Sequence, residues 1–175
     1  RRLSSAASDV YKRQYMYGID KMFLMMEKQK NRGQDGAGFA SLKLDLKPGD
    51  KYFFRVRSFD QQAIHSVFRK INKKITQFLK LENVSTNSDE FFKKVPFIGQ
   101  IMLGHVRYGT YGKNSIDYVH PVMRQNNWMN RNLILAGNFN MTNNDELFKS
   151  LVQLGQHPRE PVSYTHLRAH ETSPH

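Results

Sequence analysis

The stretch GHVRYGTYG, residues 104–112, ends a short apolar run and places Arg107 at its exit. The run at 98–106 has the length and apolar character of a buried strand. An arginine that leaves such a strand can hold a carboxylate in its planar fork. The alternative is a structural ion pair, so this stretch alone predicts either an anion-binding strand end or a buried salt bridge.

Two other polar stretches also lie at the ends of predicted elements. NRGQDGAG, residues 31–38, has closely spaced glycines whose backbone N–H groups could approach an anion. It lacks the lysine of a P-loop, and a tight helix-to-strand turn is the simpler interpretation. LAGNFNMTN, residues 135–143, carries asparagine amides of the kind that form an oxyanion hole. Alone, such a segment is more often only a turn.

Apolar spacing predicts the elements around these stretches. A helix is indicated at 19–26 and should end before Gly33, a residue that can turn the chain left-handed at low cost. The strongest pattern predicts a helix at 64–79. Its apolar stripe consists of Ile64, Val67, Phe68, Ile71, Ile75, Phe78 and Leu79.

Strands and a last helix complete the expected pattern. Alternating Leu42, Leu44 and Leu46 predict a half-buried strand with the leucines on the buried face, and 52–57 can return beside it. Residues 81–94 are polar and predict a surface insertion. A helix after Asn143, with Leu147, Leu151 and Leu154 inward and Gly155 closing it, is the last element. This mixed order favours an α+β fold over a parallel doubly wound one.

Composition excludes several classes of protein. The 175 residues contain no cysteine, which excludes a disulfide scaffold and a thiolate metal site. His166 and His170 have the spacing of two metal ligands but lack a carboxylate at ligand spacing, so we expect no metal. No apolar run of membrane-spanning length is present. The formal net charge of +12 is compatible with a nucleic-acid partner, yet no nucleic-acid motif accompanies it, so none is expected.

In this order and spacing, the three stretches resemble the N-terminal-nucleophile (Ntn) glutaminase domain of class II amidotransferases. The family's motifs read approximately HRGQDSAG, GHVRYST and LAHNGNLTN. The similarity is greatest to amidophosphoribosyltransferases of a divergent, Bacteroidetes-type group, and it covers residues 15–160. Residues 1–14 and 161–175 resemble translated sequencing adapter. The implied fold is an Ntn-hydrolase-type αββα sandwich, two antiparallel sheets between helix layers, incomplete at both ends.

The resemblance also implies roles for individual residues. Asn138 and the backbone N–H of Phe139 match the oxyanion hole, although Phe139 stands where the family has glycine. Arg107 matches the arginine that binds the glutamine α-carboxylate. Tyr108, Thr110 and Arg32 match the remaining substrate-binding positions.

Two parts of the family's machinery have no counterpart in the chain. One is the nucleophilic cysteine, and the other is the aspartate that binds the glutamine α-amine. The chain as given is therefore expected to be inactive. In the family, ammonia from glutamine passes to phosphoribosyl pyrophosphate in purine biosynthesis. The synthase domain that does this holds Mg²⁺, and no cofactor is implied for the glutaminase part. The resemblance further implies a cytoplasmic, homo-oligomeric full-length protein that binds glutamine and neither membrane nor nucleic acid.

Three other interpretations stay open. The chain could be a non-catalytic paralogue that binds glutamine through Arg107. It could be the glutaminase domain of another class II amidotransferase, with an acceptor such as a hexose phosphate. It could also be a basic nucleic-acid-binding protein, whose binding would weaken steeply with salt.

Overall fold

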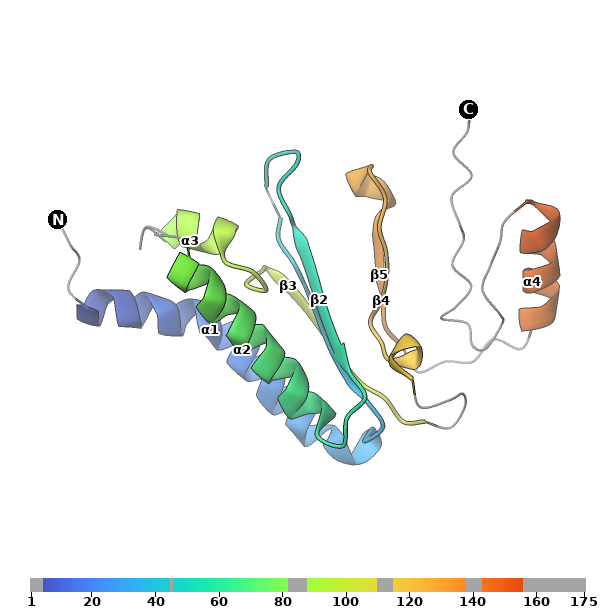
Figure 1. Ribbon diagram of the computed structural model, residues 1–175, viewed down its shortest axis with the longest axis horizontal. Helices are drawn as coiled ribbons and strands as arrows, with labels where there is room; N and C mark the ends of the chain where they lie inside the picture. The colour runs from blue at the N-terminus through green and yellow to red at the C-terminus, as the bar shows by residue number, and fades with distance from the viewer. Residues whose placement is uncertain (1–4, 45, 82–87, 110–114, 138–142, 156–175) are drawn as a thin grey trace.

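The computed structural model describes residues 5–44, 46–81, 88–109, 115–137 and 143–155 (Figure 1). Helices and strands are mixed along the chain without strict alternation, so the α+β class is confirmed. The helices are α1 (Ser5–Lys28), α2 (Ala63–Leu81), α3 (Ser88–Lys94) and α4 (Asn144–Gln153), with 3₁₀ turns η1 (Lys30–Arg32), η2 (Ile116–Tyr118) and η3 (Met129–Arg131). The strands are β1 (Ala37–Leu42), β2 (Phe53–Ser58), β3 (Ile101–Val106), β4 (Val122–Arg124) and β5 (Leu133–Leu135).

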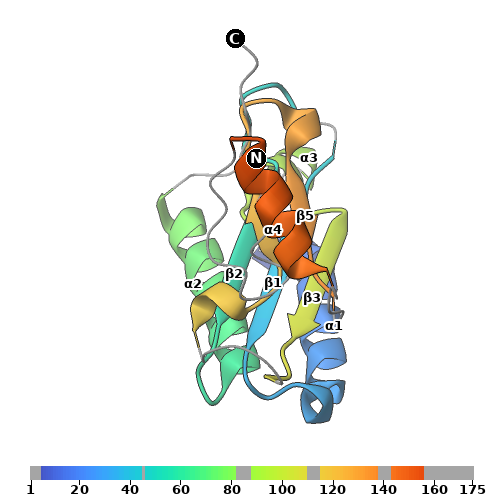
Figure 2. The ribbon, with the colours of Figure 1, turned by 90° about the vertical axis from the view of Figure 1, so that its right-hand side faces the viewer.

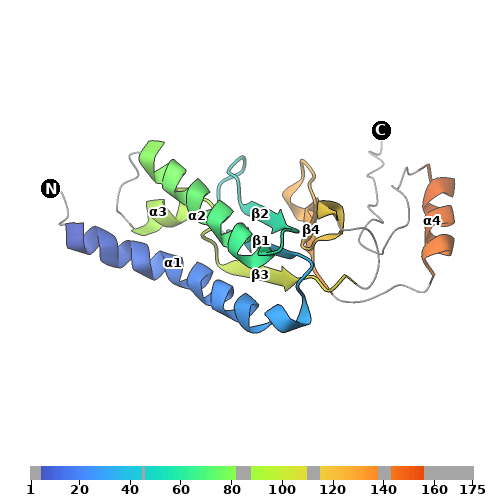
Figure 3. The same ribbon diagram turned by 60° about the horizontal axis from the view of Figure 1, so that its bottom comes forward.

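Five strands form two antiparallel sheets in the described part of the chain. The larger has the order β2-β1-β3, in which Ala37 lies opposite Ser58 and Val106. The smaller pairs β4 with β5. Helices α1 and α2 cover one face of the larger sheet, and the β4–β5 sheet lies on its other side (Figures 1 and 3). Seen from the right-hand side of Figure 1, α4 lies in front of β5 (Figure 2).

The core lies between the larger sheet and the two long helices. Phe39 in the middle of β1 has no exposed surface, and its ring meets the edge of Phe68 on α2 at a centroid distance of 5.8 Å. Phe68 in turn meets Phe23 of α1 at 5.2 Å. The predicted stripe of α2 is confirmed: its members from Ile64 to Ile75 are buried, and Phe78 and Leu79 pack partly buried against them.

The helices differ from prediction at their ends. Helix α1 begins at Ser5, well before the predicted helix at 19–26, because no glycine or proline interrupts 5–17. In α4 the expected inward position of Leu154 was wrong, because this residue lies past the helix end and is 68% exposed. Gly155, at φ 71°, does close that helix.

The predicted strand through Leu42, Leu44 and Leu46 was wrong beyond Leu42, where β1 ends, and its leucines do not form the face that the helices bury. Ser41 and Lys43 are each only 2% exposed, whereas Leu44 is 43% exposed. Because side chains alternate along a strand, Ser41 and Lys43 share the face of Phe39, which the helices cover. The leucines belong to the opposite face.

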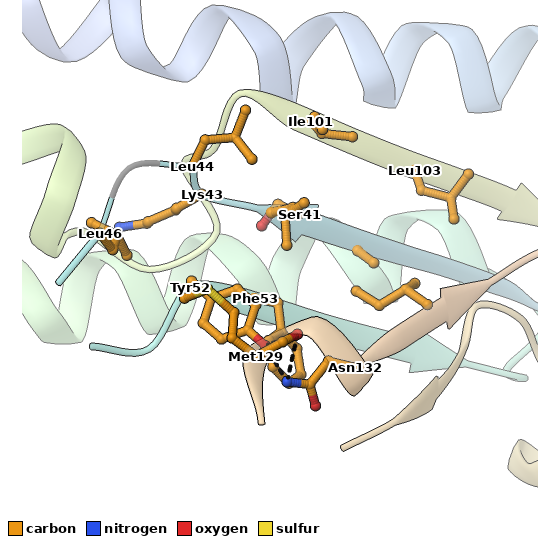
Figure 4. A pocket seen from close by; sticks show the side chains of 13 residues that line it. Ser41, Lys43, Leu44, Leu46, Tyr52, Phe53, Ile101, Leu103, Met129 and Asn132 are labelled. Carbon is orange, nitrogen blue, oxygen red and sulfur yellow. Dashed lines mark hydrogen bonds between the residues drawn. The ribbon is translucent and has the colours of Figure 1, made fainter. Parts of the chain in front are cut away.

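That opposite face borders an apolar cavity of about 610 Å³ (Figure 4). Strands of both sheets contribute to its wall. It is lined by Ala40, Leu42, Leu44, Leu46, Phe53, Ile101, Leu103, Met129 and Ile134, together with Ser41, Lys43, Tyr52 and Asn132. At one end the Asn132 amide donates a hydrogen bond to the Tyr52 hydroxyl, and that hydroxyl donates to the Met129 carbonyl at 3.3 Å. The leucines therefore line this cavity.

Lys43 holds the end of α3. Its Nζ donates to the carbonyl oxygens of Phe92 at 2.8 Å, Lys93 at 2.7 Å and Val95 at 2.7 Å. The predicted surface insertion at 81–94 thus contains a helix tied to the core, with Phe91 only 6% exposed. Burial lowers the pKa of Lys43 to about 8, although the charge of Asp50 opposes the shift.

We expect Lys43→Met to lower the free energy of unfolding by about 2 kcal/mol, because three carbonyls at the end of α3 lose their donor. The folded-state pKa of about 8 lies below the ordinary 10.5. The unfolded chain therefore binds more protons between those values, and wild-type stability should rise with pH across that window. The variant should lack this rise. Denaturant titrations from pH 7 to 10.5 measure both effects. The exposed Lys47→Met is the control, and equal stability of the two variants would contradict the expectation.

Candidate functional site

The first two polar stretches meet at the end of β3. The N–H of Asp35 donates to the carbonyl of Arg107 at 3.0 Å, and the N–H of Arg107 donates to the carbonyl of Gly36 at 2.7 Å. The Asp35 carboxylate also accepts the N–H of Gly109 at 2.6 Å. These bonds continue the β1–β3 pairing past the strand ends. The backbone on both sides of the Arg107 side chain is therefore fixed.

Gly33 makes this meeting possible, for a reason that differs from the predicted one. Its backbone is extended, at φ −171° and ψ 105°, so the expected left-handed turn is absent at this residue. An added Cβ would instead lie 2.8 Å from the Val106 carbonyl oxygen and 2.9 Å from the Arg107 carbonyl carbon. Glycine is needed here because two backbone segments approach closely.

The Arg107 side chain is nearly covered. It is 5% exposed, and its guanidinium lies over the Tyr118 ring at 5.7 Å from the ring centre. Stacking on an aromatic face suits the flat guanidinium and fixes its plane. A carboxylate that met this group would do so in a largely desolvated setting, where a charge-assisted hydrogen bond is strong.

The third stretch begins beside the second. The N–H of Gly137, which directly precedes Asn138, donates to Nδ1 of His120 at 3.2 Å. The His120 ring lies 4.6 Å from the ring of His105, tilted by 52°. His105 is on β3, two residues before Arg107. All three polar stretches are therefore brought together at one end of the larger sheet.

His105 is uncharged at neutral pH in this setting. Burial lowers its pKa, a hydrogen bond with the Gly137 backbone opposes the shift, and the charge of Arg107 adds to it. Its Nδ1 is buried and has no hydrogen-bond partner within the described residues. A neutral His105 avoids placing a second positive charge near Arg107.

The other predicted site residues are either exposed or outside the described residues. Tyr108 follows Arg107 but is 63% exposed, and Arg32 is exposed at the end of η1. Thr110, Asn138 and Phe139 lie outside the described residues. The structure therefore positions Arg107, the predicted carboxylate-binding arginine. It also positions residues 135–137, the start of the predicted oxyanion stretch at 135–143.

Sequence reasoning missed the residues that hold the segment 119–121. Arg57 donates from Nη1 to the carbonyl of Val119 at 2.8 Å, and Arg55 donates to that of Pro121 at 3.4 Å. Both arginines come from β2, so they tie this segment to the larger sheet. Their spacing of two within a strand was a usable signal that they share one face.

Neither a membrane helix nor a metal cluster is found in the ranges that the structure covers. None of the helices there has the length and apolar character needed to cross a bilayer. Likewise, no three His, Asp or Glu side chains of those ranges gather as metal ligands.

The apolar cavity of about 610 Å³ is a poor site for an amino acid with two charged groups. Lys43, the charged side chain at its border, already donates to three carbonyls.

Comparison with known proteins gives no assignment: no protein-family model matches the chain, and no curated protein matches it.

Proposed function

We propose that the chain is part of the glutaminase domain of a class II amidotransferase, most similar to amidophosphoribosyltransferase. One observation carries the proposal. Three stretches that are distant in sequence, at 31–38, at 104–109 and at Gly137, converge at one end of one sheet. That convergence is what a site assembled from these motifs requires.

The layer order supports an Ntn-hydrolase-type αββα sandwich. Helices α1 and α2 form an outer layer, followed by the β2-β1-β3 sheet and the β4–β5 sheet, with α4 beyond them (Figure 1). The apolar cavity lies where the inner faces of two stacked sheets would meet. The proposed site lies at one end of the larger sheet, on backbone that is held by hydrogen bonds.

Glutamine would bind with its α-carboxylate on Arg107 and its side-chain amide toward the oxyanion stretch. In the complete enzyme a cysteine thiolate attacks the amide carbon, and negative charge develops on the amide oxygen. Asn138 and the backbone N–H of Phe139 would stabilise that charge. Release of ammonia then leaves an acyl-enzyme that water hydrolyses.

Acceptor, metal and location belong to the same proposal. Ammonia would pass to phosphoribosyl pyrophosphate in a cytoplasmic, homo-oligomeric enzyme of purine biosynthesis, whose Mg²⁺ is held by the synthase domain. The glutaminase domain of another class II amidotransferase would use the same glutamine site, and only the acceptor would differ.

We expect the 175-residue chain to bind L-glutamine in preference to D-glutamine and to release no ammonia above the buffer rate, because it contains no cysteine. Calorimetric titration measures the binding, and a coupled ammonia assay measures the turnover. Failure to bind L-glutamine would count against the proposed function. Measured turnover would instead show that the assigned chemistry is wrong.

A non-catalytic glutamine-binding paralogue is the second candidate, since Arg107 is present and cysteine is not. It would give the same binding result. The native coding sequence upstream of Tyr15 separates the two candidates: a cysteine some two dozen residues upstream favours the enzyme, and continuous coding sequence without one favours the paralogue.

A further inference from the structure

We propose that His120 is a positioning residue for the oxyanion stretch, an inference that rests on the proposed function. Its Nδ1 accepts the N–H of Gly137 at 3.2 Å. Gly137 is covalently joined to Asn138, so a constraint on its peptide group is a constraint on where that stretch begins. His120 acts through Gly137 and does not itself touch glutamine.

His120 is suited to this role because its own backbone is fixed. The residue is 3% exposed, and the carbonyls on either side of it, those of Val119 and Pro121, accept hydrogen bonds from Arg57 and Arg55. Its own carbonyl lies against Gly38 of β1, where a Cβ would overlap it. The backbone that carries the imidazole is therefore held by two strands of the larger sheet.

The His120 ring also connects the two ends of the proposed site. It packs 4.6 Å from His105, which precedes Arg107 on β3. One end of glutamine would meet Arg107, and the other would meet donors that follow Gly137. The packed rings therefore fix the separation of the β3 end, which carries Arg107, from Gly137, and small errors in such a separation reduce binding and rate strongly.

The hydrogen bond identifies the tautomer of His120. Because Nδ1 is the acceptor, the proton of neutral His120 is on Nε2, and protonation of Nδ1 abolishes the acceptor. His105 packs against its ring, and Arg55 and Arg57 of β2 donate to the carbonyls of the residues on either side of it. The acceptor is therefore present only while His120 is neutral.

Two substitutions separate the acceptor from the ring. His120→Phe keeps a ring but has no acceptor, and His120→Asn keeps an oxygen near the place of Nδ1 but has no ring. We expect His120→Phe to weaken glutamine binding at pH 8 about tenfold and to speed amide exchange of Gly137 by at least as much. His120→Asn should keep most of the affinity.

The test uses the full 175-residue chain, with Gly137 exchange followed by NMR and glutamine affinity by calorimetry. His65→Phe is the matched control, because this exposed histidine meets Phe23 edge-on, away from the site, and its replacement should change neither reading. Wild-type values for His120→Phe would overturn the proposal. Equal losses in both His120 variants would also overturn it, since ring packing would then explain them. If wild type fails to bind glutamine, the proposed function fails, while Gly137 exchange still decides the role of His120.

Discussion

Replacing Gly38 with alanine should lower the free energy of unfolding by about 4 kcal/mol, a value at the severe end for single substitutions. Gly38 is in the central strand β1, opposite Arg57 and His105. A Cβ there would overlap the carbonyl oxygen of His120 and lie 2.8 Å from Cδ of Pro121. Neither side can yield cheaply, because β1 is paired on both edges and the segment 119–121 is held by β2. Separating them would break those bonds and part His105 from His120.

Denaturant unfolding measures this effect, and Gly18→Ala is the matched control. Gly18 is in α1, where an added Cβ meets only the terminal Cε and Sδ atoms of Met102, at 2.9 and 3.2 Å. A flexible side chain can move, and alanine favours a helix over glycine by about 1 kcal/mol. The control should be neutral or slightly stabilising. A Gly38→Ala chain within about 1 kcal/mol of wild type would show that the two segments do not approach as described.

Replacing Arg107 with methionine should weaken glutamine binding about 100-fold, or about 3 kcal/mol. Because Arg107 as a residue is only 5% exposed, its guanidinium would meet the carboxylate away from bulk water, where such a contact is strong. Methionine keeps an unbranched stem against Tyr118 but supplies no charge and no donor. Calorimetric titration measures the change.

Arg131→Met removes the same charge from an exposed residue in η3, so it controls for net charge. It should bind glutamine as wild type does, because exposed charges more than a Debye length from the ligand are screened. Equal losses in the two variants would mean that overall charge, and not Arg107, governs binding.

The long helix α2 was the most predictable part of the fold. In α2 the apolar stripe reports directly which face packs, because one face of a surface helix meets the core and the other meets water. Alternation in β1 reports less, since it separates two faces without saying which the helices cover. Both faces of β1 are enclosed, one by helices and one by the inter-sheet cavity. The burial of Lys43 could not be predicted from the local sequence, because the carbonyls that accept hydrogen bonds from its Nζ belong to residues some fifty positions away.

The site was predictable only in part for a similar reason. Arg107 could be assigned because a strand exit is a local feature. The role of His120 depends on Gly137, Arg55 and Arg57, contacts that span the chain and leave no local pattern. Gly33 could be noticed from sequence as a turn residue. Its actual constraint, close approach to the backbone at 106–107, depends on how the segments pack.

A cycle of two proteins and two ligands tests most directly whether Arg107 binds the glutamine α-carboxylate. The proteins are wild type and Arg107→Met, and the ligands are L-glutamine and 4-aminobutanamide, which is glutamine without that carboxylate. We expect wild type to bind 4-aminobutanamide about 100-fold more weakly than glutamine, and the variant to bind both ligands equally weakly. The opposite result is a variant that loses affinity for both ligands alike, or a wild type that does not distinguish them. Either would show that Arg107 does not hold the carboxylate and would contradict the assignment of a glutamine site here.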